Sequence, residues 1–377
     1  MQYIKPTHSL LIIGNGFDLN CQIKSSFSDF IETVERDSNI WYLLFRFAFP
    51  SEFYEGNHFI EAIRVDDILW KDVESLIKRV LFLSIFDKKK SETTRLEKFF
   101  SVSNYVELLK TIYSNRFNSQ FHYSDEQIVL LKNYFTVKFP AGPRRPLLNI
   151  LDFLYKELLA FENDFQKYIE HISENNVYRA KSIQLFNLLQ EKNAEIYDVL
   201  SFNYTFPKYS GNYSFQCYSF NYIHGSIDEK IIIGYDSSDL DIEIGKELQL
   251  SKIYQKLMSN LKSFSLPNKD EVSCIKIYGH SLGSQDYSYF HSIFDYYDIA
   301  NNKNISLNFC YTPFKATSAE NEKIKEEYIS NVYKLLNKYS SLRNNAESID
   351  TLTNRLLLEN RLHIRTIDSL SDKGETK

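Results

Sequence analysis

The expected fold is decided near the start of the chain, by Ser-Leu-Leu-Ile-Ile-Gly at residues 9–14. A continuous apolar run that ends in glycine is typical of a strand buried on both faces, as in the parallel sheet of an α/β protein. The next residues, Asn-Gly-Phe-Asp at 15–18, place a second glycine close behind Gly14. Two glycines there allow a phosphate to approach backbone N–H groups at a helix start. Because Leu19 occupies the third glycine position of G-x-G-x-x-G, the turn by itself fits a structural turn and a dinucleotide site equally well.

Further β-type runs occur in the second half of the chain. They cover residues 197–202, 220–224, 231–234, 272–278, 305–311 and 362–367. Residues 286–297 and 319–339 lie between the later runs and have helical apolar spacing. This alternation of strands and helices is typical of a parallel sheet with crossover helices.

Residues 30–195 have a different pattern, because their apolar residues follow helical spacing. Between Leu147 and Phe165, leucines and phenylalanines recur in alternating steps of four and three, directly after Pro146. We therefore predict an α/β protein whose Rossmann-like parallel-sheet core is formed by residues 1–30 and 195–377. A mostly helical insertion, residues 31–194, interrupts this core.

The composition argues against several classes of protein. The 377 residues carry a net charge of -5, so nucleic acid is not an expected partner. Four cysteines without a C-x-x-C pair indicate a reducing compartment and give no sign of a zinc site. The sequence has neither a signal-peptide pattern nor the roughly 20 consecutive apolar residues of a membrane helix. We expect a cytoplasmic protein with no membrane contact and no metal.

Two polar side chains follow the second and third predicted core strands. Asn203 lies in Ser-Phe-Asn-Tyr-Thr at 201–205, and His224 lies in Tyr-Ile-His-Gly at 222–225. Ligands of open α/β sheets bind at the carboxyl ends of the strands. There an amide can orient water, and an imidazole can accept a proton near neutral pH. A turn-forming asparagine and a buried structural histidine are the alternative interpretations.

A serine hydrolase is a further alternative. Residues 279–283, Gly-His-Ser-Leu-Gly, follow a predicted strand and match G-x-S-x-G, with Ser281 in the nucleophile position. His224-Gly225 would then serve as an oxyanion loop. Asp295 or Asp298 and then His363 follow in the required acid and histidine order. This hypothesis leaves the turn at Gly14 without a role.

Taken in order, five short blocks resemble the bacteriophage abortive-infection AbiH family. They are Ile-Ile-Gly-Asn-Gly-Phe-Asp-Leu at 12–19, Trp-Lys-Asp-Val-Glu at 70–74, the blocks at 201–205 and 223–225, and Tyr-Gly-His-Ser-Leu-Gly at 278–283 with Asp286. The same skeleton is similar to sirtuin-type NAD-consuming domains. The resemblance implies a phage-defence effector that hydrolyses NAD at the nicotinamide–ribose bond and kills or arrests the infected cell.

The resemblance also implies roles for particular residues. Asn203 and His224 would flank the nicotinamide ribose as the catalytic pair. The turn at 14–18 would line the phosphates or ribose, and residues 279–286 would hold the adenosine side. The implied NAD-binding residues are Gly14, Asn15, Gly16, Phe17, Asp18, Gly225, Gly279, His280, Ser281, Gly283 and Asp286.

Two points limit what the resemblance implies. The four-cysteine zinc module of deacetylating sirtuins is missing, so protein deacylation is not expected. A non-enzymatic alternative also stays open, in which the core senses NAD or a related nucleotide and the helical insertion binds a partner. A phage protein as trigger and a second copy of the chain are further partners that the sequence leaves open.

Overall fold

The computed structural model describes residues 8–35, 38–48, 73–74, 76–77, 134, 148–190, 195–205, 216–236, 246–259, 264–313, 317–343 and 349–370. The chain divides into two compact units. Unit 1 comprises Met1–Ser26, Gln166–Ile231 and Leu261–Lys377, and unit 2 comprises Phe27–Phe165 and Ile232–Asn260. The predicted boundaries of the helical insertion stay a prediction, because most of residues 49–147 lie outside the described residues.

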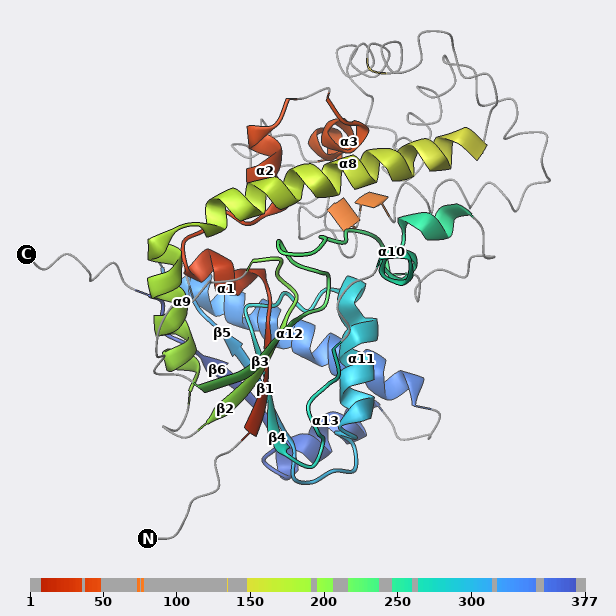
Figure 1. The fold of residues 1–377 in the computed structure, drawn as a ribbon. Helices are drawn as coiled ribbons and strands as arrows, with labels where there is room; N and C mark the ends of the chain where they lie inside the picture. The colour runs from red at the N-terminus through yellow and green to blue at the C-terminus, as the bar shows by residue number, and fades with distance from the viewer. Residues whose placement is uncertain are drawn as a thin grey trace, which may run out of the picture. The chain divides into compact units, whose positions relative to one another are not determined.

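Unit 1 contains a six-stranded sheet in which all paired strands are parallel, which confirms the predicted α/β class (Figure 1). The strands are β1 (His8–Ile13), β2 (Ile196–Ser201), β3 (Gln216–Tyr222), β4 (Val272–Tyr278), β5 (Ser306–Tyr311) and β6 (Leu362–Thr366). Their order is β3-β2-β1-β4-β5-β6, so the chain builds outward from β1 first on one side and then on the other. The order therefore changes direction between β1 and β4. Open α/β sheets bind ligands beyond the carboxyl ends of their strands at such a point.

Helices pack on both faces of this sheet. They are α1 (Asn15–Asn20), α9 (Asn176–Leu189), η5 (Ser284–Asp286), α11 (Tyr287–Tyr296), α12 (Ser318–Leu342) and α13 (Ile349–Leu358). Leu11 and Ile13 of β1 join a buried cluster with α9, whereas Leu10 and Ile12 join a cluster with α11, α12 and α13. Successive side chains of a strand point to opposite faces, so a strand covered on both sides is apolar throughout. The apolar run at 9–14 has this physical cause.

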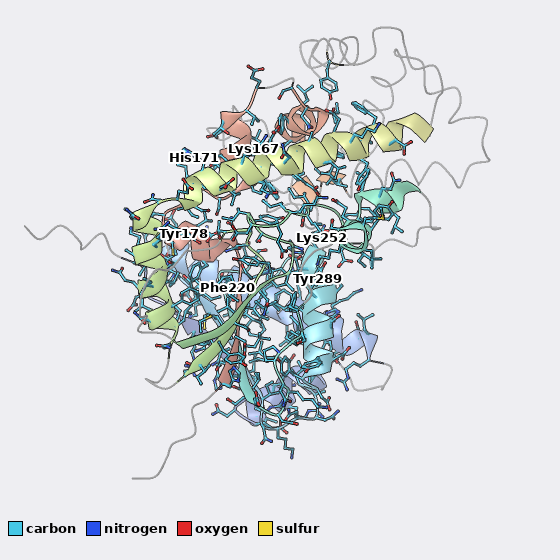
Figure 2. The ribbon with its side chains drawn as sticks, in the orientation of Figure 1. Lys167, His171, Tyr178, Phe220, Lys252 and Tyr289 are labelled. Atoms are coloured by element: carbon cyan, nitrogen blue, oxygen red, sulfur yellow. The ribbon has the colours of Figure 1, made fainter. Side chains whose placement is uncertain are left out.

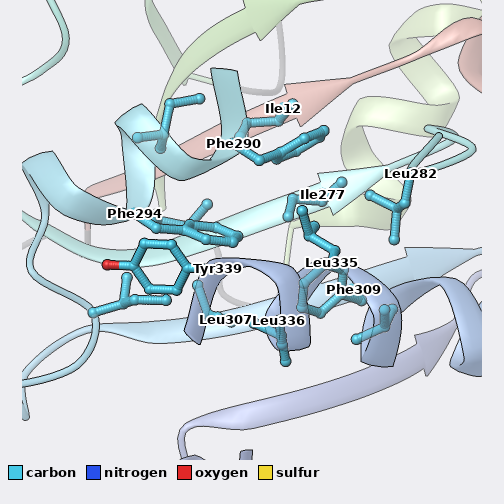
Figure 3. Packing of buried hydrophobic residues seen from close by; sticks show 14 of the residues in the cluster. Ile12, Ile277, Leu282, Phe290, Phe294, Leu307, Phe309, Leu335, Leu336 and Tyr339 are labelled. Atoms are coloured by element: carbon cyan, nitrogen blue, oxygen red, sulfur yellow. The ribbon is translucent and has the colours of Figure 1, made fainter. Parts of the chain in front are cut away.

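Figure 2 shows Tyr178 on α9 and Tyr289 on α11, one from each of these helical layers. Figure 3 shows the cluster that α11 and α12 form with the sheet, where Phe290 and Phe294 lie over Ile12 and Ile277. Burial of each large apolar side chain contributes roughly 1.5–3 kcal/mol. This packing holds the strand ends, and the loops that leave them, in fixed register.

Unit 2 is helical in its described parts. Its elements are α2 (Phe27–Thr33), α3 (Ile40–Ala48), the first part of α8 (Leu148–Ser173), η4 (Lys246–Leu250) and α10 (Lys252–Met258). Rings from three of these helices form an aromatic core, with Phe30 5.7 Å from Tyr42 and 5.4 Å from Phe161. Helix α8 contains the predicted stripe from Leu151 to Phe165 and continues beyond it to Ser173, whereas Leu147 lies outside the described residues. None of the helices in the described ranges is long and apolar enough to cross a bilayer.

Residues 231–234 form no strand, so that prediction is wrong. Side chains take the place of a neighbouring strand, because the Ile233 N–H donates to Glu162 Oε1 at 2.8 Å and the Ile233 carbonyl accepts from Gln255 at 2.6 Å. The block at 70–74 is described at two positions only. Of these, Glu74 is buried and pairs with the buried Lys252 of α10 at 2.7 Å.

Candidate functional site

The turn after β1 is tied to the loop after β4 by backbone contacts. The Gly14 N–H donates to the Tyr278 carbonyl at 3.0 Å, and the Gly16 N–H donates to the Gly279 carbonyl at 2.7 Å. A Cβ atom on Gly14 would lie 2.7 Å from His280 Cα, and one on Gly16 would lie 2.8 Å from Gly279 Cα. Both glycines are therefore required by the close approach of two loops. Because their N–H groups already have partners here, phosphate binding by these two amides stays a prediction.

The loop after β4 is bent by two left-handed residues. Gly279 has φ +66°, and a Cβ there would lie 2.4 Å from Phe17 N. Leu282 has φ 57°, a conformation that leucine seldom adopts. The bend carries His280 and Ser281 back toward the ends of β1 and β4.

Asn203 connects the end of β2 to this turn. The Phe202 N–H donates to the Ile13 carbonyl at 2.9 Å, which continues the register of the two strands, and Asn203 Nδ2 donates to the Gly14 carbonyl at 3.0 Å. The side chain is 5% exposed. The predicted convergence of the turn and the amide is therefore seen directly. The structure also gives the amide an anchoring role in addition to any contact with a ligand.

Asp18 is buried beneath the turn, and protein groups occupy both of its carboxyl oxygens. Tyr178 donates to Oδ1 at 2.9 Å and Thr205 donates to Oδ2 at 2.7 Å. Burial raises the pKa of Asp18 from 3.8 to about 7, and the hydrogen bonds from Thr205, Tyr178, Asn203 and Ser25 oppose this rise. This carboxyl group joins α1, α9 and the loop after β2. A direct contact with NAD stays a prediction.

Two other residues of the turn have structural partners. The Phe17 ring is buried against Phe186, with 4.9 Å between ring centroids. Asn15 is partly exposed, and its Oδ1 accepts from Ser25 at 2.5 Å. Phe17 therefore supports the turn through packing.

His224, in the loop after β3, shares a carboxylate with His280. Asp286 Oδ1 lies 3.2 Å from His224 Nε2, and Asp286 Oδ2 lies 3.4 Å from His280 Nε2. The two histidines are buried, with His224 4% exposed, whereas Asp286 is partly exposed. Two segments that are far apart in the chain, the loop after β3 and the residues that follow β4, thus meet at the carboxyl edge of the sheet. The resemblance implies that Asp286 binds the adenosine side of NAD, but in the structure its oxygens face the two imidazoles.

Aromatic rings surround the two histidines. Phe202 meets His224 edge to face at 5.4 Å and His280 edge to face at 4.5 Å, and it stacks on Phe290 at 5.3 Å. Tyr289 also meets His224 edge to face, with 5.3 Å between ring centroids. These rings restrict how the imidazoles can turn and lower the local dielectric, which strengthens their interaction with Asp286.

The loop behind His224 depends on Gly225 and Gln166. Gly225 has φ +77°, and a Cβ there would lie 1.8 Å from the Lys230 carbonyl oxygen, so glycine is required by the turn. Gln166 Nε2 donates to the Ile227 carbonyl at 3.0 Å, and Gln166 Oε1 accepts from the Ile231 N–H at 3.4 Å. One side chain of α8 thus closes this loop.

The groups of the serine-hydrolase alternative have other partners. His363 lies in the first half of β6, away from the carboxyl edge, and its Nε2 contacts the Asn360 carbonyl at 3.0 Å. Asp295 accepts from Tyr339 at 2.7 Å, and Asp298 accepts from Asn301 at 2.9 Å. Strand residues advance by about 3.3 Å each. His363 lies three positions before the carboxyl end of β6, so this length of strand separates it from the edge at which Ser281 lies. The geometry does not support this triad.

Of the remaining predicted residues, Ser281 and Gly283 are partly exposed, and both lie between His280 and Asp286 in the chain. Sequence reasoning missed Thr205, Tyr178 and Gln166, which hold Asp18 and the His224 loop. Thr205 belongs to a block that the resemblance had already singled out. Tyr178 and Gln166 lie on helices with no local pattern that marks them. Within the described residues, no group of three or more His, Cys, Asp and Glu side chains is arranged to hold a metal ion.

Comparison with known proteins identifies a family. The family described as "Bacteriophage abortive infection AbiH" matches residues 10–140 and 148–311, which is most of the chain and includes the whole carboxyl-edge site. No curated protein and no solved structure matches. The chain therefore belongs to the bacteriophage abortive-infection AbiH family, and its role is in defence against phage.

Proposed function

We propose that this protein is an NAD glycohydrolase with a Rossmann-like core, which depletes NAD in the infected cell. The observation that carries the proposal is the grouping of Asn203, His224 and the glycine turn at one edge of the sheet, with Asn203 bonded to the Gly14 carbonyl at 3.0 Å. The strand order β3-β2-β1-β4-β5-β6 supports it, because dinucleotide-binding sheets use this order and bind at the same edge. A role in abortive infection supports it further, since loss of NAD arrests a cell.

The reaction would break the bond between ribose C1′ and the nicotinamide nitrogen. The bonding electrons go to nicotinamide, which leaves as a neutral base, while positive charge develops on the ribose. A water oxygen then forms the new bond to C1′, and its proton passes to His224 and on to solvent. Asn203 would orient the ribose or the water. The products are nicotinamide, ADP-ribose and a proton, so no external oxidant or reductant is needed.

The test is nicotinamide release from NAD in extracts of phage-infected cells that carry the protein. A general base contributes about 10² to 10⁴-fold, so His224→Ala should lower the rate by at least about 100-fold. His363→Ala is the matched control, because this histidine lies on β6, away from the carboxyl edge, and its Nε2 contacts the Asn360 carbonyl. If the His224→Ala variant releases nicotinamide at the wild-type rate, at equal protein levels, this mechanism is ruled out.

One observation favours a second candidate, a nucleotide sensor without catalysis. His224 and Asn203 are only 4% and 5% exposed, which suits groups that hold a loop in place. Under this hypothesis a nucleotide binds, and a phage protein or a second copy of the chain responds. Calorimetry with NAD and ADP-ribose separates the two candidates. Tight binding of NAD, with no nicotinamide released even in extracts of infected cells, is the result that favours the sensor.

A further inference from the structure

The orientation of His280 is fixed from both sides of its ring. Its Nδ1 accepts the Leu282 N–H at 2.9 Å, so the neutral imidazole must carry its proton on Nε2. That nitrogen faces Asp286 Oδ2 at 3.4 Å. One oxygen of the carboxylate is thereby held by a histidine whose tautomer is set by the backbone. The other oxygen, Oδ1, is presented to His224.

The backbone that brings His280 into place is strained. Leu282, which supplies the N–H to His280, has φ 57°. Such a conformation persists in a non-glycine residue only when surrounding contacts enforce it, and these residues concentrate at functional sites. The buried, stacked Phe202 and Phe290 provide such contacts, since both rings pack against His280. The loop therefore holds a particular arrangement of His280 and Asp286.

We propose that Asp286 is the positioning residue of His224, with His280 as its anchor, and that it is not a ligand of the adenosine ribose. By accepting the Nε2 proton of His224, Asp286 leaves the lone pair on Nδ1 and stabilises the imidazolium that forms when Nδ1 takes a proton. The orienting carboxylate of a hydrolase triad acts on its histidine in this way. The proposal rests on the proposed function for its catalytic consequence. Its structural part, the tautomer and the hydrogen bond, can be measured independently.

NMR of the full chain labelled with ¹⁵N-histidine tests the structural part. We expect slowly exchanging Nε2–H signals from His224 and His280, assigned by their loss in His224→Gln and His280→Gln. Asp286→Asn should shift the His224 signal upfield or abolish it. Asp295→Asn, which changes a carboxylate on the adjoining helix α11 that accepts from Tyr339, should leave it unchanged. A His224 proton on Nδ1 in the wild type, or an unaltered signal in Asp286→Asn, overturns the proposal, and the first result requires no variant to fold.

Nicotinamide release from infected-cell extracts tests the catalytic part. Loss of an orienting carboxylate costs up to about 10⁴-fold in kcat, so we expect Asp286→Asn to lower kcat by at least about 10-fold with KM for NAD nearly unchanged. A ribose ligand would instead raise KM. If the wild type releases nicotinamide through His224 but Asp286→Asn keeps its kcat, the positioning role is wrong. If the wild type releases none, the proposed function fails, and the NMR result alone decides the assignment of Asp286.

Discussion

Unit 1 contains two buried polar clusters that belong to the same sheet but are built differently. The Lys276 cluster consists of Lys276, Glu195, Tyr197 and Ser9. Lys276 Nζ contacts the Leu189 carbonyl at 2.6 Å, Tyr197 at 3.0 Å and both Glu195 oxygens at 3.3 Å. The carboxyl-edge cluster consists of Asn203, His224, His280 and Asp286; the first three lie on loops that directly follow strands, and Asp286 ends the short helix η5.

From this difference we predict that the Lys276 cluster serves stability, and that the carboxyl-edge cluster serves the proposed chemistry. In the Lys276 cluster a full charge is buried on a regular strand, and protein groups surround its ammonium. Such an arrangement fixes the register of β1, β2 and β4 but leaves no route to a ligand. At the carboxyl edge three of the groups come from loops, and Asp286, at the end of η5, is partly exposed. Substitutions in the first cluster should therefore cost stability, and substitutions in the second should cost activity.

The largest effect is expected from Lys276→Met. This change leaves Glu195 buried without its cation, and breaking a buried ion pair in this way costs about 3–5 kcal/mol. Urea denaturation followed by circular dichroism measures the loss in the free energy of unfolding. Lys325→Met is the control, because its pair with Glu322 is exposed and contributes less than about 1 kcal/mol. Equal stability of the two variants would show that the Lys276 cluster is not structural.

A pH-dependent effect of similar size is expected from Asp18→Asn. Because burial raises the pKa of Asp18 from 3.8 to about 7, the folded state keeps a proton that the unfolded state has lost. The contribution of Asp18 to stability is thus full below pH 4 and declines as the pH rises to 7. At about 1.4 kcal/mol for each tenfold change in acidity, the decline is on the order of 4 kcal/mol.

Asp18→Asn should therefore flatten the fall in stability between pH 4 and pH 7, whereas Asp295→Asn should not. Unfolding midpoints measured across this pH range provide the comparison. A fall as steep in Asp18→Asn as in the wild type contradicts the assigned pKa.

Smaller effects on stability are expected from substitutions of two glycines of the predicted site, Gly16 and Gly283, and these effects should differ. Gly16→Ala places a Cβ 2.8 Å from the backbone of Gly279, so it should lower stability by about 1–3 kcal/mol. Gly283→Ala places a Cβ no closer than 3.7 Å, to the Ser281 hydroxyl, and should change stability by less than about 0.5 kcal/mol. Thermal midpoints of the two variants test this contrast. Two variants of equal stability would argue against the close packing of the loops after β1 and β4.

Much of the sheet could be predicted from the sequence, because strands buried on both faces leave continuous apolar runs. The run at 272–278 coincides with β4, and the ends of β1 and β2 were placed within one residue. The run at 231–233 is equally apolar but pairs with Glu162 and Gln255, and apolar spacing carries no information about such partners.

The site residues that follow strands could be predicted from the sequence. The residues and contacts that support them could not. Asn203 and His224 follow predicted strands, so topology alone brings them to one edge. Tyr178 lies 160 residues from its partner Asp18, and no local pattern links the two. The pairing of Asp286 with His224 and His280 depends on the left-handed backbone of Gly279 and Leu282, which the sequence pattern does not predict.

We propose that the carboxyl edge of this sheet consumes NAD during infection. The most direct test measures cellular NAD through phage infection in cells that carry the wild type or Asn203→Ala, with folding of the variant checked by its unfolding midpoint. We predict that NAD falls in wild-type cells and stays at its uninfected level in cells with Asn203→Ala. An equal fall of NAD in both, or a constant level in both while wild-type cells still block the phage, would contradict NAD consumption at this site.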